Sequence, residues 1–205
     1  MRYIEFRKIM EGFPVFSLAD IRQADPAFHR RRLNEWQEKG YLKKVIKGYY
    51  IFADLPLDEK DLFKIANRIY APSYVSFEMA LAYYGLIPES VYGITSASTR
   101  KTMHFKTTIG EFSYRTIRPK LYFGFEYLTG NSRHAKIASP EKALLDYFYL
   151  HPELNDADGF REMRISREAV SEKINHKKLM SYAGVYAQKS LKGRVEAFWE
   201  YITHA

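Results

Sequence analysis

The sequence predicts an α+β fold, and three observations support this class. A basic helix followed by a β-hairpin is written into the first 52 residues, between Ser17 and Phe52. The hydrophobic period changes from about 3.6 towards 2 near Val91, which favours strands. After Ser139 the pattern returns to amphipathic segments of helical period. We therefore expect a first domain at residues 1–53, a mixed α/β domain at 54–150 and a helical C-terminal segment at 151–205 that packs on the second domain.

The clearest element of the first domain is the basic helix. Asp25 is suited to the N-cap and Pro26 to the first helical position, where a missing N–H has no cost. Gly40 tolerates the left-handed turn that commonly ends a helix. These signals predict a helix over Pro26–Lys39. Two shorter helices are expected before it, one ending near Gly12 and carrying Ile4, Ile9 and Met10, and one near Leu18–Gln23.

A hairpin is predicted directly after the basic helix. Leu42–Ile46 and Tyr49–Phe52 have strand-like content, and Lys47-Gly48 between them is suited to a tight turn. A short helix, a basic helix and then a hairpin is the order typical of a winged helix-turn-helix that reads DNA. The N-terminal domain is therefore predicted to be such a module.

The outward face of the basic helix supplies the candidate DNA-binding residues. At about 100° per residue, Leu33 and Trp36 face inward with His29. Ala27, Arg31 and Asn34 face outward, as do two acids, Glu35 and Glu38. Arginine can pair with guanine and asparagine with adenine in the major groove, whereas Arg30, nearer the flank, suits a phosphate. The alternative is that Arg30–Arg32 are an ordinary solvated helix face.

Charge and composition narrow the class of protein. The chain of 205 residues carries a net charge of +8, with 46% hydrophobic and 27% charged residues, which is typical of a globular protein. Residues 1–52 hold 11 Lys or Arg against 6 Asp or Glu, and such local excess favours a polyanion. There is no cysteine, so disulfides and thiolate metal sites are excluded. A charged N-terminus and the lack of a long apolar run lead us to expect a cytoplasmic protein.

The second domain and the tail are predicted from periodicity and caps. Helices are expected over Asp58–Tyr70, over Phe77–Tyr84 with Ser76 as the cap, and from Ser139 to Leu150. Strands are expected at 93–98, 103–107, 111–117 and 121–126, forming a small, largely antiparallel sheet. In the tail the best helices are Ser171–Ala183 and Leu191–Ile202, with breaks at Gly184 and Gly193.

No pattern of a catalytic or cofactor site is found. The glycines form no phosphate-binding loop, and the histidines show no metal-ligand spacing, so no cofactor, metal or catalytic residue is predicted. Glu141 and Asp146 share a helix but lie about 140° apart around its axis. We expect Glu141 to act as a helix-dipole acid, and Asp146 to pair with a base or a backbone amide.

A second group of basic residues falls on the predicted strands and turns. Its members are Arg100, Lys101, Arg115 and Arg118, with Lys120 beside them. One interpretation is a patch that contacts nucleic acid or an acidic partner. The other is a set of edge-strand charges that prevent aggregation between sheets. The sequence leaves both open.

Several strings, taken together in their order and spacing, resemble the AbiEi-type antitoxins and transcriptional regulators of type IV toxin–antitoxin systems. The likeness covers roughly residues 5–150. The strings are Lys39–Leu42 (KGYL), Gly48–Tyr50 (GYY), Tyr74–Ser76 (YVS), Ala80-Leu81, Tyr84–Pro88 (YGLIP), Thr95, Thr99–Lys101 (TRK), Phe112–Arg115 (FSYR) and Ile137–Asp146 (IASPEKALLD).

The resemblance implies a regulator whose winged helix binds inverted repeats in its own promoter, as a homodimer or cooperatively. It places Arg30, Arg31, Asn34, Lys47 and Tyr49 at recognition-helix and wing positions, and Arg100, Lys101, Arg115 and Arg118 at basic positions of the second domain. It also implies that the second domain opposes a nucleotidyltransferase-like toxin encoded nearby.

Two other functions remain as alternatives. A nuclease-like second domain delivered to DNA by the winged helix would need an acid cluster at metal-binding spacing, and none is found. A protein-interaction module would need an apolar exposed face on the basic helix, and Phe28, which is predicted to point outward, is the one hint of that.

Overall fold

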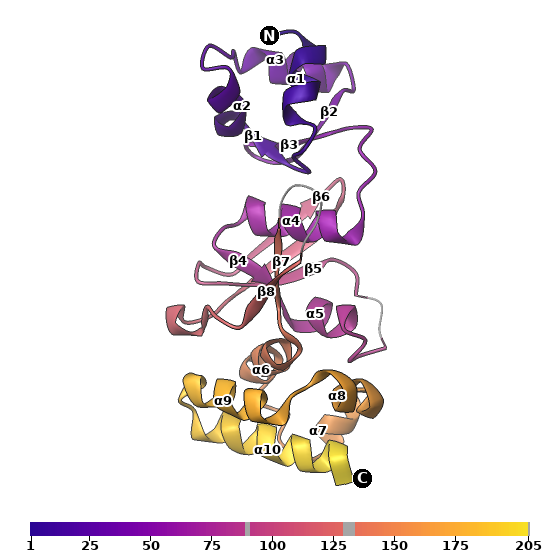
Figure 1. Cartoon of the computed structure of the whole chain (residues 1–205), viewed down its shortest axis with the longest axis vertical. Helices are drawn as coiled ribbons and strands as arrows, with labels where there is room; N and C mark the ends of the chain where they lie inside the picture. Colours follow the sequence, from indigo (N-terminus) through magenta and orange to yellow (C-terminus); the bar gives the residue numbers. More distant parts are fainter. Residues whose placement is uncertain (89–90, 129–133, 205) are drawn as a thin grey trace.

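The structure is a computed structural model that describes residues 1–88, 91–128 and 134–204. It is an α+β protein built in tiers along its long axis (Figure 1). An N-terminal module lies at one end, a six-stranded sheet crosses the middle, and the C-terminal helices cover the other end. The predicted α+β class is confirmed. Among the described residues, no helix is long and apolar enough to cross a membrane.

The N-terminal module combines three helices with a small antiparallel sheet. Its elements are α1 (Tyr3–Met10), β1 (Phe16–Ser17), α2 (Leu18–Ala24), α3 (Arg31–Glu38), β2 (Leu42–Ile46) and β3 (Tyr49–Phe52). The sheet has the order β1-β3-β2, because β3 pairs with both neighbours. Its core is largely aromatic, with Phe6 stacked among the rings of Phe16, Phe28, Trp36 and Phe52.

The beginning of the basic helix was predicted wrongly. Helix α3 starts at Arg31, and Asp25 instead ends α2 by donating its N–H to the carbonyl of Ile21. The Asp25 carboxylate accepts the N–H of Ala27 at 3.1 Å, so this Asp-Pro pair forms a turn. The turn carries Phe28 into the aromatic core, where it is 3% exposed rather than outward. His29, predicted to face inward, is exposed.

Of the three apolar residues that predicted the first helix, only Met10 is buried. Phe6 and Met10 of α1 are buried, whereas Ile4 and Ile9 are 70% and 43% exposed. Residues four apart share a helix face, so Phe6 and Met10 form the inner stripe. The two isoleucines lie outside it.

The main sheet is mixed, and this corrects the prediction of a small, largely antiparallel one. Its order is β6-β7-β5-β4-β9-β8. The pairs β4–β9 and β5–β7 are parallel, and the other three neighbouring pairs are antiparallel. The strands are β4 (Ser73–Val75), β5 (Ile94–Ser98), β6 (Met103–Thr107), β7 (Gly110–Thr116), β8 (Phe125–Leu128) and β9 (Ala135–Ala138). Where a strand was predicted at 121–126, a 3₁₀ turn η1 (Pro119–Leu121) precedes β8.

Helices cover both faces of this sheet. Helix α4 (Glu59–Ile69) lies on the side of the N-terminal module, and α5 (Phe77–Tyr83) and α6 (Pro140–Leu150) lie on the other (Figure 1). Neighbouring side chains of β7 point alternately to the helices on the two faces. The Tyr114 hydroxyl donates to the Ala66 carbonyl of α4 at 2.8 Å, while Arg115 pairs with Glu78 of α5.

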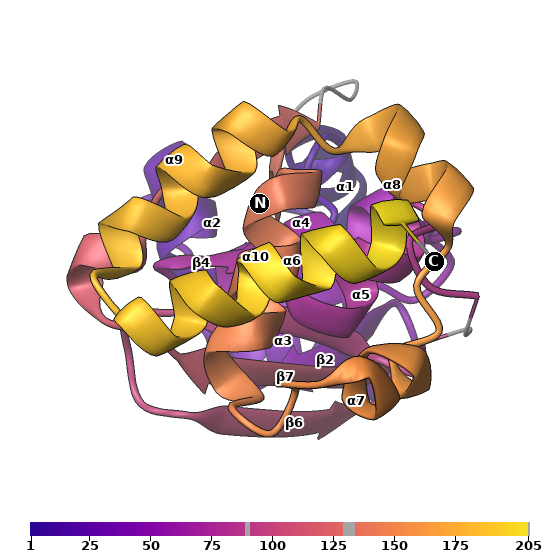
Figure 2. The same ribbon diagram turned by 90° about the horizontal axis from the view of Figure 1, so that it is seen from below.

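The C-terminal helices form the last tier. They are α7 (Ala157–Glu162), α8 (Arg167–Lys173), α9 (His176–Tyr186) and α10 (Lys189–His204), and α9 and α10 pack beside α6 (Figure 2). The predicted breaks at Gly184 and Gly193 are wrong, since both glycines lie inside helices. The chain breaks instead at Asn175, which caps α9 through its side chain, and at Ala187, which adopts a left-handed conformation.

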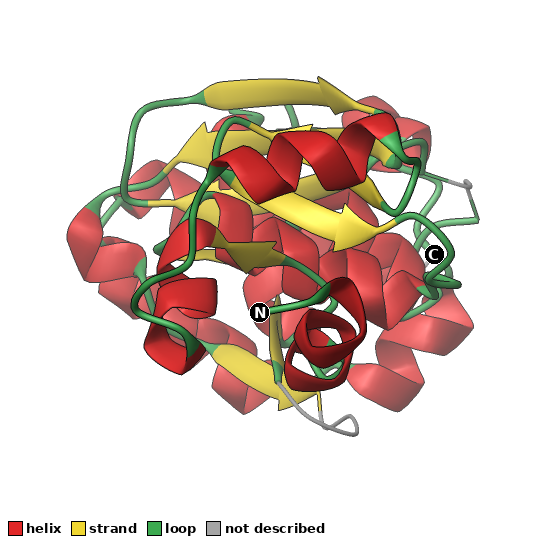
Figure 3. Cartoon of the chain, turned by 90° about the horizontal axis from the view of Figure 1, so that it is seen from above, coloured by secondary structure: helices red, strands yellow, loops and turns green. Residues whose placement is uncertain are grey.

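The N-terminal module rests directly on the middle tier (Figures 1 and 3). Val15, Val45 and Ile51 belong to the same buried apolar cluster as the residues of α4 and the main sheet. An ion pair also crosses the boundary, between the Arg68 guanidinium of α4 and the buried Asp20 carboxylate of α2. Two regions that the sequence separates at residue 53 therefore share apolar and ionic contacts.

Candidate functional site

The outer face of α3 presents the candidate DNA-binding residues to solvent. Arg30, Arg31 and Asn34 are exposed, while Leu33 and Trp36 on the opposite side are buried. The Arg31 side chain is 88% exposed, and its Nε lies 3.5 Å from a Glu35 carboxylate oxygen. An exposed pair of this kind contributes little to stability, so the guanidinium can exchange Glu35 for another acceptor.

The remaining predicted DNA-binding residues lie in different environments. Ala27 is exposed but lies on the turn before α3, not in the helix where the sequence placed it. Lys47 is exposed at the tip of the hairpin, where Gly48 has a φ of +91° that favours glycine. Tyr49, in contrast, is half-buried and packs against the main apolar cluster. Its ring therefore joins the hairpin to the rest of the protein.

Sequence reasoning missed two further lysines of the hairpin. Lys43 and Lys44 of β2 are both exposed. Strand β2 is an edge of the small sheet, and it also lies beside β6 of the main sheet. Two adjacent lysines in a predicted strand could have identified them, because exposed lysines are common on edge strands. Like Arg30, Arg31 and Lys47, both are basic residues of the module whose side chains are open to solvent.

The basic residues of the second domain do not form a single patch. The Arg100 guanidinium stacks 4.0 Å from the centre of the Tyr70 ring and donates to the Ala71 carbonyl, on the side of α4. Arg115 pairs with Glu78 at 2.9 Å, on the side of α5. The two side chains thus leave opposite faces of the sheet. Lys101 and Arg118 are exposed at the sheet's edge and turns.

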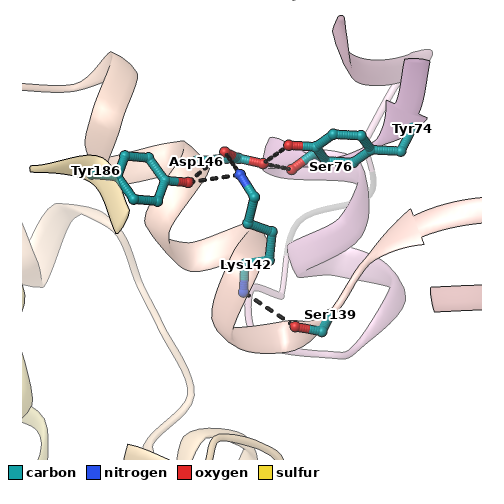
Figure 4. Close-up of polar contacts among 6 residues, drawn as sticks. All are labelled: Tyr74, Ser76, Ser139, Lys142, Asp146 and Tyr186. Carbon is teal, nitrogen blue, oxygen red and sulfur yellow. Dashed lines mark hydrogen bonds and ion pairs between the residues drawn. The ribbon is translucent and has the colours of Figure 1, made fainter. Parts of the chain in front are cut away.

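The most polar part of the interior is a cluster on α6 (Figure 4). Lys142 and Asp146 are one helical turn apart and both are 0% exposed. The Lys142 ammonium donates to Asp146 Oδ1 and to the Tyr186 hydroxyl of α9, the latter at 2.8 Å. We name the set formed by Lys142, Asp146, Tyr74, Ser76 and Tyr186 the Lys142 cluster.

Every acceptor site of the Asp146 carboxylate is used. Oδ1 accepts from Lys142 and from the Tyr186 hydroxyl at 2.7 Å. Oδ2 accepts from the hydroxyls of Tyr74 and Ser76, each at 2.8 Å. The prediction that Asp146 pairs with a base is confirmed. Ser76 was predicted to cap α5, but its side chain makes no cap hydrogen bond and turns to Asp146 instead.

Burial sets the proton affinities of the cluster. It lowers the pKa of Lys142, although the neighbouring Asp146 partly offsets this by favouring the ammonium. Burial, with the Asp146 charge beside them, raises the pKa of Tyr74 and of Tyr186 well above the ordinary tyrosine value. The tyrosines therefore remain hydrogen-bond donors throughout the physiological range.

Close packing surrounds the lysine stem. The ammonium lies 5.1 Å from the centre of the Phe123 ring and 5.0 Å from that of Tyr186. Gly124 has a φ of +71°, and a Cβ there would lie 2.9 Å from the Tyr182 ring and 3.2 Å from the Lys142 stem. Because its members are at most 1% exposed, the cluster joins the sheet, α5, α6 and α9 without offering a surface to a substrate.

Glu141, next to this cluster, ties α6 to the start of α9. It is 3% exposed, accepts the Asn175 N–H at 3.1 Å and pairs with Lys178 at 2.8 Å. Burial alone would raise the pKa of Glu141, but the hydrogen bonds from Lys178, the backbone and Ser139 hold it below the ordinary range. Its place in the first turn of α6 fits the predicted helix-dipole acid, and its links to α9 were not predicted.

Metal-binding groups and similarity to known proteins also bear on the function of the chain. Within the described residues, no group of three or more His, Asp or Glu side chains is placed to hold a metal ion. A comparison with models of known protein families finds none that matches this chain, and a comparison with curated proteins finds no match either.

Proposed function

We propose that this protein is a DNA-binding transcriptional regulator whose N-terminal module acts as a winged helix-turn-helix. The observation that carries the proposal is the exposure of basic side chains on α3 and on the β2–β3 hairpin that follows it. Arg31 and Asn34 lie on the outer face of α3, and Lys43, Lys44 and Lys47 follow on the hairpin. Helix α3 would enter the major groove and the hairpin would lie along the phosphates.

The topology of the module supports this assignment. The order α1-β1-α2-α3-β2-β3, with a three-stranded antiparallel sheet, places a helix directly before a hairpin. Buried Leu33 and Trp36 fix the inner face of α3, so the arginines and Asn34 keep a constant outward direction. In Figure 1, α1 and α3 lie towards the free end of the module, and β1 and β3 lie towards the second domain.

A binding function fits the interior better than catalysis does. The most polar buried group, the Lys142 cluster, is closed to solvent and its carboxylate is fully hydrogen-bonded. A fully satisfied network rigidifies a core and specifies its packing. We therefore assign it to the folding of the second domain.

The resemblance to AbiEi-type proteins extends the proposal. On that basis the regulator represses its own operon through inverted repeats, acts in the cytoplasm and opposes a nucleotidyltransferase-like toxin encoded nearby. One winged helix buries little surface, so two or more copies on one operator would supply the affinity. The antitoxin half is tested by expressing the neighbouring gene with and without this chain and measuring growth.

The DNA half is tested by a salt-series titration of the protein on its own upstream DNA and on a scrambled duplex of equal length. We expect upstream DNA to bind tighter by ~10³-fold or more. Lys47→Ala should weaken both duplexes and lower the salt slope by about 1, because it removes a phosphate contact. Equal binding to both duplexes would show that the basic side chains of α3 and the hairpin bind DNA without specificity, and no binding would overturn the proposal.

A further inference from the structure

Two adjoining cavities flank Val91 on the side of the second domain. One has a volume of about 270 Å³ and is walled by Leu81, Ile87 and Met163. The other, of about 370 Å³, is walled by Leu62, Met79, Ile109 and Phe112. Since Val91 lines both, the two cavities adjoin at this residue, and we name them together the Val91 groove. It passes from α4 over α5 to α7, which follow one another down the long axis in Figure 1.

The charged residues of the Val91 groove are all acidic. Glu78 and Glu162 line the smaller cavity, and Asp58, Glu59 and Glu111 line the larger one. Among the described lining residues there is no lysine, arginine or histidine. The chain as a whole carries a net charge of +8, so this acidic surface runs against the overall composition. Such a local field favours a cationic partner.

Some of these carboxylates lack partners of their own. Within the described parts of the chain, Glu59 and Glu162 pair with no basic side chain. Glu78 uses Oε1 for Arg115, whereas its Oε2 is buried and accepts no hydrogen bond. A buried carboxylate oxygen without a donor is costly, and a new donor at this place would stabilise it.

The other two acids are engaged. Asp58 caps α4 by accepting the Asp61 N–H at 2.7 Å. Glu111 lies 3.2 Å from His104 and 3.6 Å from Lys106, in exposed positions where such pairs exchange readily. The carboxylates without a basic partner are therefore Glu59 in the larger cavity and Glu162 in the smaller one, where Glu78 adds a buried oxygen without a donor.

The apolar part of the groove continues onto the surface. Tyr92, beside Val91, is 98% exposed, the largest exposure of any large hydrophobic residue described. Aromatic side chains that stand free next to an apolar depression are typical of protein-binding surfaces.

We infer that the Val91 groove binds a cationic amphipathic segment of a partner polypeptide. Apolar side chains of the segment would fill the two cavities, and its lysine or arginine side chains would pair with Glu59 and Glu162. A segment fits better than a small cation, because the two free acids line different cavities: Glu162 the smaller and Glu59 the larger. The inference does not depend on DNA binding, since the groove is lined by the second domain and by residues 162–163 at the end of α7, outside the N-terminal module.

The first test uses a fluorescein-labelled 18-residue Leu/Lys peptide with leucines at helical spacing, and a scrambled isomer of the same composition. The full-length protein should bind the amphipathic peptide at least ~10-fold more tightly than the isomer, since only the ordered peptide presents an apolar face. Glu59→Lys with Glu162→Lys should weaken binding by ~10-fold or more. The matched control, Glu172→Lys with Glu196→Lys, reverses two exposed acids elsewhere and should leave affinity within about 2-fold.

The second test locates the bound peptide. The chain has no cysteine, so Tyr92→Cys introduces a unique thiol at the rim of the groove. A chloroacetylated peptide should crosslink to it several times faster than to Val185→Cys, which is 42% exposed on α9 away from the groove. Equal crosslinking at both positions, equal binding of the isomer, or an unchanged affinity in the groove variant would overturn the inference.

Discussion

Removing Lys142 and Asp146 from water costs several kcal/mol per ion, and their mutual attraction offsets this only when the remaining hydrogen bonds are made. Here they are made, because two tyrosine hydroxyls and a serine hydroxyl complete the shell of the carboxylate. Each donor comes from a different part of the chain: Tyr74 from β4, Ser76 from the start of α5, and Tyr186 from α9. The pair therefore favours one specific packing of these elements.

Replacing the buried lysine should be far more damaging than replacing an exposed one. Lys142→Met leaves Asp146 as an unpaired buried charge and should lower the free energy of unfolding by about 3–5 kcal/mol. The matched control is Lys192→Met, which removes an ammonium 53% exposed and 3.7 Å from Glu196 at the same helical spacing. That change should cost less than about 0.5 kcal/mol. Urea denaturation followed by circular dichroism measures both, and similar losses would refute the special role of the buried pair.

Glu141 makes the free energy of unfolding depend on pH in the acidic range. Its carboxylate is favoured in the folded state, so the unfolded chain binds a proton at a higher pH than the folded chain does. The stabilisation is complete above the ordinary value near 4.5 and is lost as pH falls through the lower folded pKa. Glu141→Gln should flatten this part of the curve of unfolding free energy against pH, whereas the exposed Glu172→Gln should leave it unchanged. A wild-type slope in Glu141→Gln would contradict this assignment.

At the scale of elements, α3 separates residues that support the fold from residues that face outward. Phe28 lies in the aromatic core just before the helix, and Arg31 is 88% exposed on the first turn. Phe28→Ala should lower the free energy of unfolding by about 3–5 kcal/mol, since it empties a packed site. Arg31→Ala should change it by less than about 0.5 kcal/mol.

Arg31→Ala also tests the proposed role of α3 in DNA binding. Arg31→Ala should weaken binding to upstream DNA by about 1–3 kcal/mol and relax base preference at one position, while the fold stays intact. The measurement combines urea denaturation with the salt-series titration. If Arg31→Ala binds upstream DNA as tightly as the wild type, α3 does not read the bases.

The elements show which physical signals a sequence carries. The helices α2, α4 and α6 were predicted within a residue or two, because caps and apolar stripes are local features. Strands β4 and β9 were missed, since short segments buried on both faces show no alternation. The glycines of α9 and α10 were read as breaks, but packing against α6 outweighs a helix-propensity cost of about 1 kcal/mol.

In the candidate sites, too, local features were predictable and tertiary contacts were not. The outward face of α3 was predictable from Leu33 and Trp36, whereas the start of the helix was not, because the burial of Phe28 is a tertiary effect. Asp146 was expected to pair with a base. Lys142, four residues earlier on the same helix, could have been identified as that base, because residues four apart share a helix face. Tyr74, Ser76 and Tyr186 could not be joined to it without the fold, since 40 to 72 residues separate them from Asp146 along the chain.

At the scale of the whole molecule, the N-terminal module and the rest share one boundary. Val15, Val45 and Ile51 continue the main apolar cluster, and Arg68 pairs with Asp20, which is 6% exposed. If this boundary couples the two parts, they should unfold together.

The two tryptophans make this coupling measurable, because Trp36 lies in the N-terminal module and Trp199 in α10. In a Trp199→Phe background, the fluorescence of Trp36 and the far-ultraviolet circular dichroism should give coincident urea transitions. Arg68→Ala removes the partner of a buried carboxylate, so it should lower the free energy of unfolding by about 1–3 kcal/mol and move both urea midpoints down together. Arg161→Ala, which breaks an exposed pair with Asp158, is the control and should shift neither midpoint measurably. A Trp36 transition that separates from the circular dichroism in the Trp199→Phe background would show instead that the module unfolds independently.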